Sequence, residues 1–271
     1  EEVYKVIIDG LNLAYTNLPA DNTFYADKYA AKALLARVYL QQSNYAGARD
    51  AANDVIENSG HRLSTNYAAA FNHDTDQTED VFAIQITKQT GLNDLNTFYA
   101  SQNNGGRGGD FSIRDHYLEK FTDPNDERST FNYFDEASET VLTSKFTDQF
   151  ANVTTIRLAE MYLIRAEANF QEATNVGNTP LDDINFIRAR ANAGDLPSVT
   201  IDDILLEREL ELGMEGFLIH DIRRTKRSID ISESGDGSDL ILYNADNLVF
   251  PIPLKEMDTN KKITQNPGYN F

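Results

Sequence analysis

The sequence predicts a mainly α-helical protein in which helical hairpins carry long loops of polar and aromatic residues. Apolar residues recur at the helical spacing i, i+3, i+4, i+7 in two regions, 25–58 and 155–225. The residues between these regions are rich in Asn, Asp, Thr and Gly, a composition typical of loops. We therefore expect one domain, 1–271, with helical hairpins in both regions, a loop-rich insertion at 60–150 and a C-terminal tail at 226–271.

The first hairpin, at 25–58, has the clearest periodicity. Its two apolar stripes consist of Ala31, Leu34, Leu35 and Val38, then Ala48, Ala51, Ala52 and Val55. The small alanines of the second helix allow the two helix axes to approach closely, and Gly60 predicts the end of that helix. The spacing of small and large apolar residues in both helices matches a tetratricopeptide unit.

A second helical pair is expected from Thr155 onward, and a further helix follows it. The second helix of the pair has a clear start, because Thr179 suits the N-cap, Pro180 the first helical position and Asp182 the third. The next helix opens at Thr200 with an acidic residue three positions on, similar to a capping box. Its expected apolar face consists of Leu206, Leu210, Met214 and Phe217.

Three shorter elements are expected outside the hairpins. Residues 1–18 and 113–121 fit helices, and residues 80–87 fit a strand. The glycine-rich run 103–109 neither follows a clear strand nor ends in Lys-Ser or Lys-Thr, so we do not interpret it as a phosphate-binding loop.

The charge balance and the hydropathy pattern exclude two classes of protein. The chain has 24 Lys and Arg against 43 Asp and Glu, a formal net charge of −19 at pH 7. This charge repels phosphate backbones, so nucleic acid is not an expected partner. No apolar run approaches the roughly 18 residues of a membrane-spanning helix, and no export signal is recognisable in these residues.

No set of residues predicts catalysis, a cofactor or a metal site. Cysteine is absent, and the four histidines lack ligand spacing. The carboxylate pairs 182–183 and 202–203 could serve glycoside hydrolysis, but each falls in the first turn of an expected helix, where it stabilises the helix dipole. The acidic loop 74–80 lacks the glycine and glutamate of an EF-hand. We therefore expect a solvated loop there, and a protein that is not an enzyme.

Segments along nearly the whole chain follow the order of motifs in a known family. They include AAKALLARVYL at 30–40, DVFAIQ at 80–85, DPNDER at 123–128, RLAEMYLIRAEA at 157–168, LERELEL at 206–212, FPIP at 250–253 and QNPGY at 265–269. In this order the chain resembles the C-terminal portion of the SusD/RagB family of outer-membrane nutrient-binding lipoproteins from the Bacteroidetes.

The resemblance implies a fold, a location and two partners. The implied fold is a tetratricopeptide-like superhelix, and the implied location is the extracellular face of the outer membrane. The implied partners are a SusC-like TonB-dependent transporter and an oligosaccharide or peptide ligand. The implied function is capture of starch or another glycan and its delivery to the transporter for nutrient uptake. Membrane attachment is expected only through a lipid anchor outside these residues.

Candidate ligand-binding residues follow from what a sugar requires. Sugar rings stack on flat apolar faces, and their hydroxyl groups bond to planar polar groups. The insertion supplies both at Phe98, Tyr99, Asn103, Arg107 and Tyr133. Packing of these aromatic side chains onto the helices is the alternative, because large aromatic side chains are usually part of a core, and the chain has no tryptophan.

A second function stays open for the whole chain. Tetratricopeptide-like hairpins also serve as scaffolds that bind peptides or protein partners. An exposed aromatic pocket in the insertion would favour oligosaccharide binding, whereas an open concave helical surface would favour the scaffold.

Overall fold

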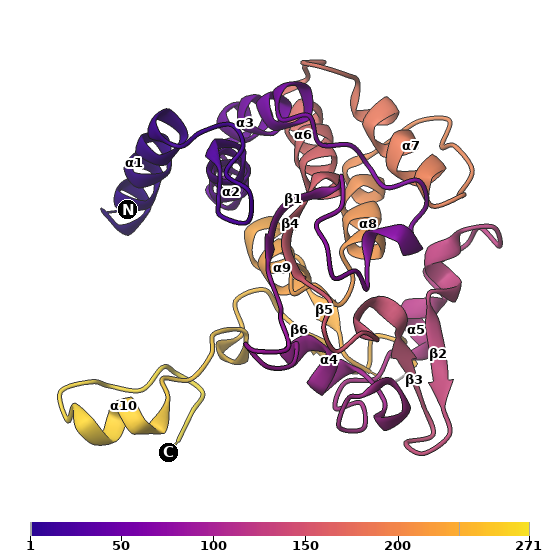
Figure 1. Ribbon diagram of the computed structural model, residues 1–271. Helices are drawn as coiled ribbons and strands as arrows, with labels where there is room; N and C mark the ends of the chain where they lie inside the picture. The colour runs from indigo at the N-terminus through magenta and orange to yellow at the C-terminus, as the bar shows by residue number, and fades with distance from the viewer. Residues whose placement is uncertain (1, 233, 271) are drawn as a thin grey trace. The chain divides into compact units, whose positions relative to one another are not determined.

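The computed structural model describes residues 2–232 and 234–270 of the chain. The chain forms two compact units, Glu1–Glu215 and Gly216–Phe271 (Figure 1). The first unit contains the hairpins and the insertion, and the second contains the tail. The expectation of a single domain stays a prediction.

The longer helices of the first unit pack one against another. They are α1 (Glu2–Asn17), α2 (Lys28–Gln41), α3 (Tyr45–Asn58), α6 (Leu158–Glu172), α7 (Pro180–Arg190) and α8 (Ile201–Glu211). Helix α2 contacts α1 and α3, α3 contacts α6, and α6 contacts α7 and α8. The insertion therefore leaves the helical stack after α3 and returns to it at α6 (Figure 1). The predicted hairpins are confirmed.

Side-chain caps determine where the helices begin. The Thr179 side chain accepts the N–H of Asp182 at the start of α7, with proline in the first turn. Thr200 and Asp203 form a reciprocal capping box at the start of α8. Both predicted starts are confirmed. Helix α3 ends before Gly60, whose φ of 82° lies in the left-handed region that favours glycine.

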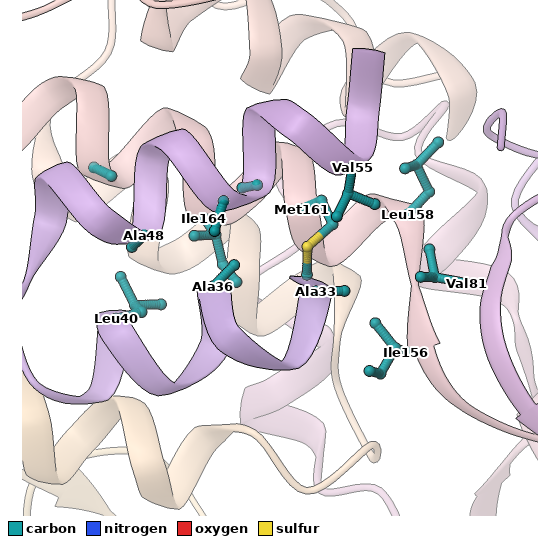
Figure 2. Packing of buried hydrophobic residues seen from close by; sticks show 13 residues of the cluster. Ala33, Ala36, Leu40, Ala48, Val55, Val81, Ile156, Leu158, Met161 and Ile164 are labelled. Carbon is teal, nitrogen blue, oxygen red and sulfur yellow. The ribbon is translucent and has the colours of Figure 1, made fainter. Parts of the chain in front are cut away.

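Small side chains form the centre of the core between α2, α3 and α6. Ala36 of α2 and Ala48 of α3 are completely buried. Figure 2 shows Ile164 of α6 beside these alanines, and Met161 of α6 between Val55 of α3 and Ala33 of α2. Because alanine hardly separates neighbouring helix axes, three helices share one closely packed centre.

The expected apolar face of α2 is wrong in part. Leu34 is on an exposed side of the helix, while Ala33 and Ala36 belong to the core. Helix α2 is covered by α1, α3 and α6, so its buried surface is wider than one helical stripe. Small residues such as Ala33 and Ala36 fit between closely packed helices, whereas Leu34, which the periodicity favoured, lies outside this contact.

The expected apolar face of α8 is also wrong in part. The helix ends at Glu211. Met214 has a φ of 65°, a left-handed conformation that does not occur inside a right-handed α-helix. Leu206 is exposed, whereas Glu207 and Glu211 are buried. Hydrophobic periodicity misplaces this face because ion pairs occupy the buried side of α8.

The insertion consists of short strands and single helical turns. They are η1 (Ala68–Ala70), β1 (Asp80–Ile84), α4 (Asp94–Tyr99), η2 (Gln102–Asn104), α5 (Asp115–Leu118), η3 (Glu127–Thr130), β2 (Asn132–Asp135), β3 (Thr140–Thr143), η4 (Ser144–Phe146) and β4 (Val153–Arg157). Strand β1 pairs antiparallel with β4, and β2 pairs antiparallel with β3. The predicted strand at 80–87 and helix at 113–121 are confirmed with shorter bounds, but β2, β3 and β4 were not predicted.

The second unit has little regular structure. It contains α9 (Leu218–Thr225), β5 (Ile229–Asp230), β6 (Leu240–Ile241), η5 (Asp246–Leu248) and α10 (Leu254–Thr259). The Gln265 side chain accepts the N–H of Ile252 at 2.8 Å and donates to its carbonyl at 2.9 Å. Among the residues that the structure describes in both units, no helix combines the length and hydrophobicity needed to cross a membrane.

Candidate ligand-binding site

A buried network of charged side chains fixes the insertion to the helices. Arg157, at the end of β4, donates to Glu79 at 2.7 Å and to Glu211 of α8 at 2.9 Å. Arg128 of η3 donates to Glu207, one turn earlier on α8. All five side chains are almost completely buried. A charge in such surroundings is tolerated only when it is paired, so these contacts determine where the insertion meets α8.

The network holds the Glu211 carboxylate in the ionised form. Burial by itself raises the pKa of Glu211, but the guanidinium groups of Arg190, Arg157 and Arg128 hold it well below its usual range. Burial lowers the pKa of Lys145, whose ammonium group still donates to Glu215 at 2.6 Å. Opposite charges favour the ionised form of both partners, which suits a structural role.

The acidic loop 74–80 is solvated only in its first part. Glu79 is completely buried beside Arg157, which lies 78 residues later in the chain. Asp80 is buried too and accepts the N–H of Gln77 at 2.8 Å. The expectation of a solvated loop is therefore wrong at these two residues. Within residues 2–232 and 234–270, no group of three or more His, Asp or Glu side chains is placed to hold a metal ion.

An open cleft lies between η2 and the β2–β3 hairpin, and we call it the insertion cleft. Its volume is about 590 Å³, within the range of about 300–1,000 Å³ that is typical of ligand sites. Its lining residues are Ser101, Asn103, Asn104, Tyr133, Phe134, Asp135, Glu136 and Ala137. The cleft thus combines aromatic rings, amides and carboxylates.

Hydrogen bonds fix the η2 side of the insertion cleft. The hydroxyl oxygen of Tyr133 accepts the N–H of Ser101 at 2.9 Å, which joins β2 to the start of η2. The Asn96 side chain donates to the carbonyl of Asn104 at 3.0 Å. A side chain at Gly106 would place its Cβ 2.1 Å from a backbone oxygen. The glycine-rich run is therefore closely wrapped, and only glycine fits at this position.

The hairpin side of the insertion cleft presents an exposed aromatic ring beside a fixed acidic turn. Phe134 is 61% exposed although it lies within strand β2. Asp135 accepts the N–H of Ser138 at 3.0 Å and its hydroxyl at 2.8 Å, which closes the turn 136–139. Two paired strands therefore hold a flat apolar side chain in solvent, next in sequence to the fixed carboxylate of Asp135.

The structure separates the five candidate residues into two groups. Asn103 and Tyr133 line the insertion cleft, whereas Phe98, Tyr99 and Arg107 do not. The Tyr99 ring packs 5.1 Å from the ring of Phe146, as the packing alternative anticipates. The Arg107 guanidinium lies 4.7 Å over the Phe98 ring and also pairs with Asp110, so these two side chains contact each other.

Sequence reasoning missed most of the lining of the insertion cleft. Phe134 and the turn that follows it were not among the candidates, because strand β2 was not predicted. The useful pattern is an aromatic pair at 133–134 followed directly by two carboxylates at 135–136. Such a run places an exposed ring and acceptor groups at the tip of one hairpin.

The fold and the cleft together define a class of protein, a helical-hairpin scaffold that presents an ordered insertion with an open cleft. The model of the SusD family matches residues 41–269, which is most of the chain. The chain belongs to the SusD family. Proteins of this family are non-catalytic binding proteins, so the chain is placed with binding proteins and not with enzymes.

Known relatives share the fold over the whole chain. A SusD superfamily protein of Bacteroides thetaiotaomicron matches with a TM-score of 0.83 and 26% identity, over 98% of this chain and 66% of its own. A SusD superfamily protein of Bacteroides vulgatus matches with the same TM-score and 25% identity, over 100% of this chain and 66% of its own. The mainly helical, tetratricopeptide-like fold is confirmed.

Two characterised relatives match in sequence. A SusD-like protein of Bacteroides ovatus is 28% identical over 267 residues, which cover 79% of this chain and 49% of the relative. The starch-binding protein SusD of Bacteroides thetaiotaomicron is 32% identical over 121 residues, which cover 42% of this chain and 21% of the relative. The chain thus spans about half the length of the first relative, and its match to the second covers about a fifth of that protein.

Proposed function

We propose that this chain is part of a cell-surface protein that captures an oligosaccharide in the insertion cleft. The lining of the insertion cleft, which combines the aromatic residues Tyr133 and Phe134 with the amides of Asn103 and Asn104, carries this proposal. The apolar face of a sugar ring stacks on an aromatic side chain, and amides both donate to and accept from sugar hydroxyls. Clefts with a few convergent polar groups around an apolar surface are typical ligand sites.

The class of ligand is supported by relatives. The relative that is 32% identical over 121 residues is the starch-binding protein SusD of Bacteroides thetaiotaomicron. Delivery of the oligosaccharide to a SusC-like TonB-dependent transporter is the second part of the proposal. A lipid-anchored position on the extracellular face of the outer membrane is the third. Both of these rest on membership in the SusD family.

Titration calorimetry with a panel of oligosaccharides tests the capture step. We expect saturable binding of one glycan class, and a loss of at least about tenfold in affinity for Phe134→Ala, since aromatic rings contribute strongly to binding sites. Phe24→Ala is the matched control, because Phe24 is 65% exposed but lies between α1 and α2, and its affinity should not change. Circular dichroism establishes that both variants are folded.

Other outcomes would redirect the proposal. Binding of pooled peptides in place of glycans, unaffected by Phe134→Ala, would favour the tetratricopeptide-like scaffold and contradict oligosaccharide capture. Co-isolation of the protein with a TonB-dependent transporter from outer membranes tests the delivery step. Failure to recover a transporter with the tagged protein, under conditions that preserve outer-membrane complexes, would contradict delivery and leave capture unaffected.

A further inference from the structure

The charge inside the insertion cleft has a single sign. Of the eight described residues that line it, Asp135 and Glu136 carry carboxylates, and none is Lys, Arg or His. Glu139 follows in the same turn and is exposed. The whole chain adds a formal charge of −19, so the potential in the cleft is negative at both short and long range.

Two cationic side chains of the insertion are already paired with carboxylates. Arg107 pairs with Asp110 outside the cleft lining. Lys145 is buried and pairs with Glu215. Both positive charges are thus balanced by a carboxylate, and an incoming anion meets no Lys, Arg or His among the described residues that line the cleft.

We infer that the insertion cleft selects oligosaccharides without acidic groups and rejects chains that carry uronates or sulfates. This inference rests on the proposed function and specifies its substrate class. Hydroxyl groups of a neutral sugar can donate to the exposed carboxylate of Glu136 and to the amide oxygens of Asn103 and Asn104. An acidic sugar brings a like charge into the same space, and such repulsion is an effective means of specificity.

The position of Asp135 makes the repulsion difficult to avoid. Its side chain is buried and held by two hydrogen bonds from Ser138. It therefore cannot rotate away from an approaching anion as a mobile surface carboxylate would. Glu136 is exposed at the rim of the same cleft, so the repulsion acts from the moment of approach.

Matched pairs of oligosaccharides test the inference. A panel of neutral and acidic oligosaccharides is first screened by calorimetry. The tightest ligand is then compared with a counterpart of the same backbone, oxidised to the uronate at C6 or, for a uronate, reduced to the alcohol. We expect the acidic member to bind at least about tenfold more weakly at about 10 mM salt, and the difference to shrink at about 0.5 M salt, where charges are screened.

A charge-neutral variant separates repulsion from shape. Glu136→Gln keeps the size of the side chain, and we expect it to reduce the difference between the two members severalfold. Glu172→Gln removes one exposed carboxylate at the end of α6, outside the cleft lining, and should leave the difference unchanged.

Three results would overturn the inference. An acidic member that binds as tightly as its neutral counterpart, or more tightly, contradicts the selection but leaves oligosaccharide capture intact. A difference that responds neither to salt nor to Glu136→Gln shows that shape and not charge discriminates. Absence of binding to any glycan contradicts the proposed function itself, and the inference with it.

Discussion

Arg157 donates to both carboxylate oxygens of Glu215, from Nε at 3.1 Å and from Nη2 at 2.8 Å. The same guanidinium group contacts Glu79 before β1 and Glu211 at the end of α8. One arginine thus contacts three carboxylates, of which Glu79 is far in the sequence from Glu211 and Glu215. The insertion and the helical stack meet at this side chain.

Replacement of Arg157 by Met should strongly destabilise the first unit. The variant leaves Glu79 and Glu215 without their principal partner and removes one of the partners of Glu211 in a buried site, which typically costs about 3–5 kcal/mol. Urea unfolding measures the loss. Lys5→Met is the control, because it breaks the exposed pair between Lys5 and Asp9 and should leave the midpoint unchanged. An Arg157 variant as stable as the wild type would contradict the structural role of the network.

Acid should destabilise the protein through the same network. The pKa values of Glu211 and Glu215 are lowered in the folded state by neighbouring Arg and Lys side chains, against the effect of burial. A lowered folded-state pKa stabilises the protein above the ordinary value of 4.5, and that stability is lost as the pH falls below it. Urea midpoints between about pH 6 and pH 3 measure the loss.

Comparison of the wild type with a Gln variant isolates the contribution of Glu211 or Glu215 to the pH dependence of stability. Burial raises the pKa of Asp183, in spite of its pair with Arg165, so this group acts in the opposite direction to Glu211. In Glu211→Gln, or in Glu215→Gln if the first variant does not fold, the stability should fall less steeply with acid than in the wild type. Identical slopes for the wild type and the variant would exclude these carboxylates as the cause.

The capping box of α8 should contribute measurable stability. Thr200 accepts the N–H of Asp203, and the Asp203 carboxylate accepts the N–H of Thr200 at 2.8 Å. Thr200→Ala removes one of the two bonds and should cost about 1 kcal/mol in urea unfolding, while Thr200→Ser should preserve most of the stability. Equal losses in the Ala and Ser variants would indicate that the methyl group matters and the hydroxyl does not.

Features that depend on residues close in sequence could be predicted without the structure. The starts of α7 and α8 follow from Thr179 and Thr200, because a cap is formed by residues within one helical turn. The hairpin α2–α3 follows from its periodicity for the same reason. These elements would have a similar appearance in many different folds.

Features that depend on distant residues could not be predicted. Glu79 resembles a residue of a solvated loop until Arg157, 78 residues away, is placed beside it. The insertion cleft requires the pairing of β2 with β3 and the bond from Ser101 to Tyr133. Neither hydrophobic periodicity nor local composition contains information on such contacts, so the sequence identified only part of the cleft lining.

The Tyr133 hydroxyl should be required for the shape of the insertion cleft. Tyr133→Phe keeps the ring but leaves the buried N–H of Ser101 without its acceptor, and an unpaired buried donor typically costs about 1–3 kcal/mol. Faster hydrogen exchange of the Ser101 amide and a severalfold loss of ligand affinity are the expected results. Tyr25→Phe, at a side chain that is 75% exposed, should change neither. If the Ser101 amide exchanges at the wild-type rate in Tyr133→Phe, the bond does not hold η2 against β2, and the shape of the cleft must depend on the contacts of Asn96 with Asn104.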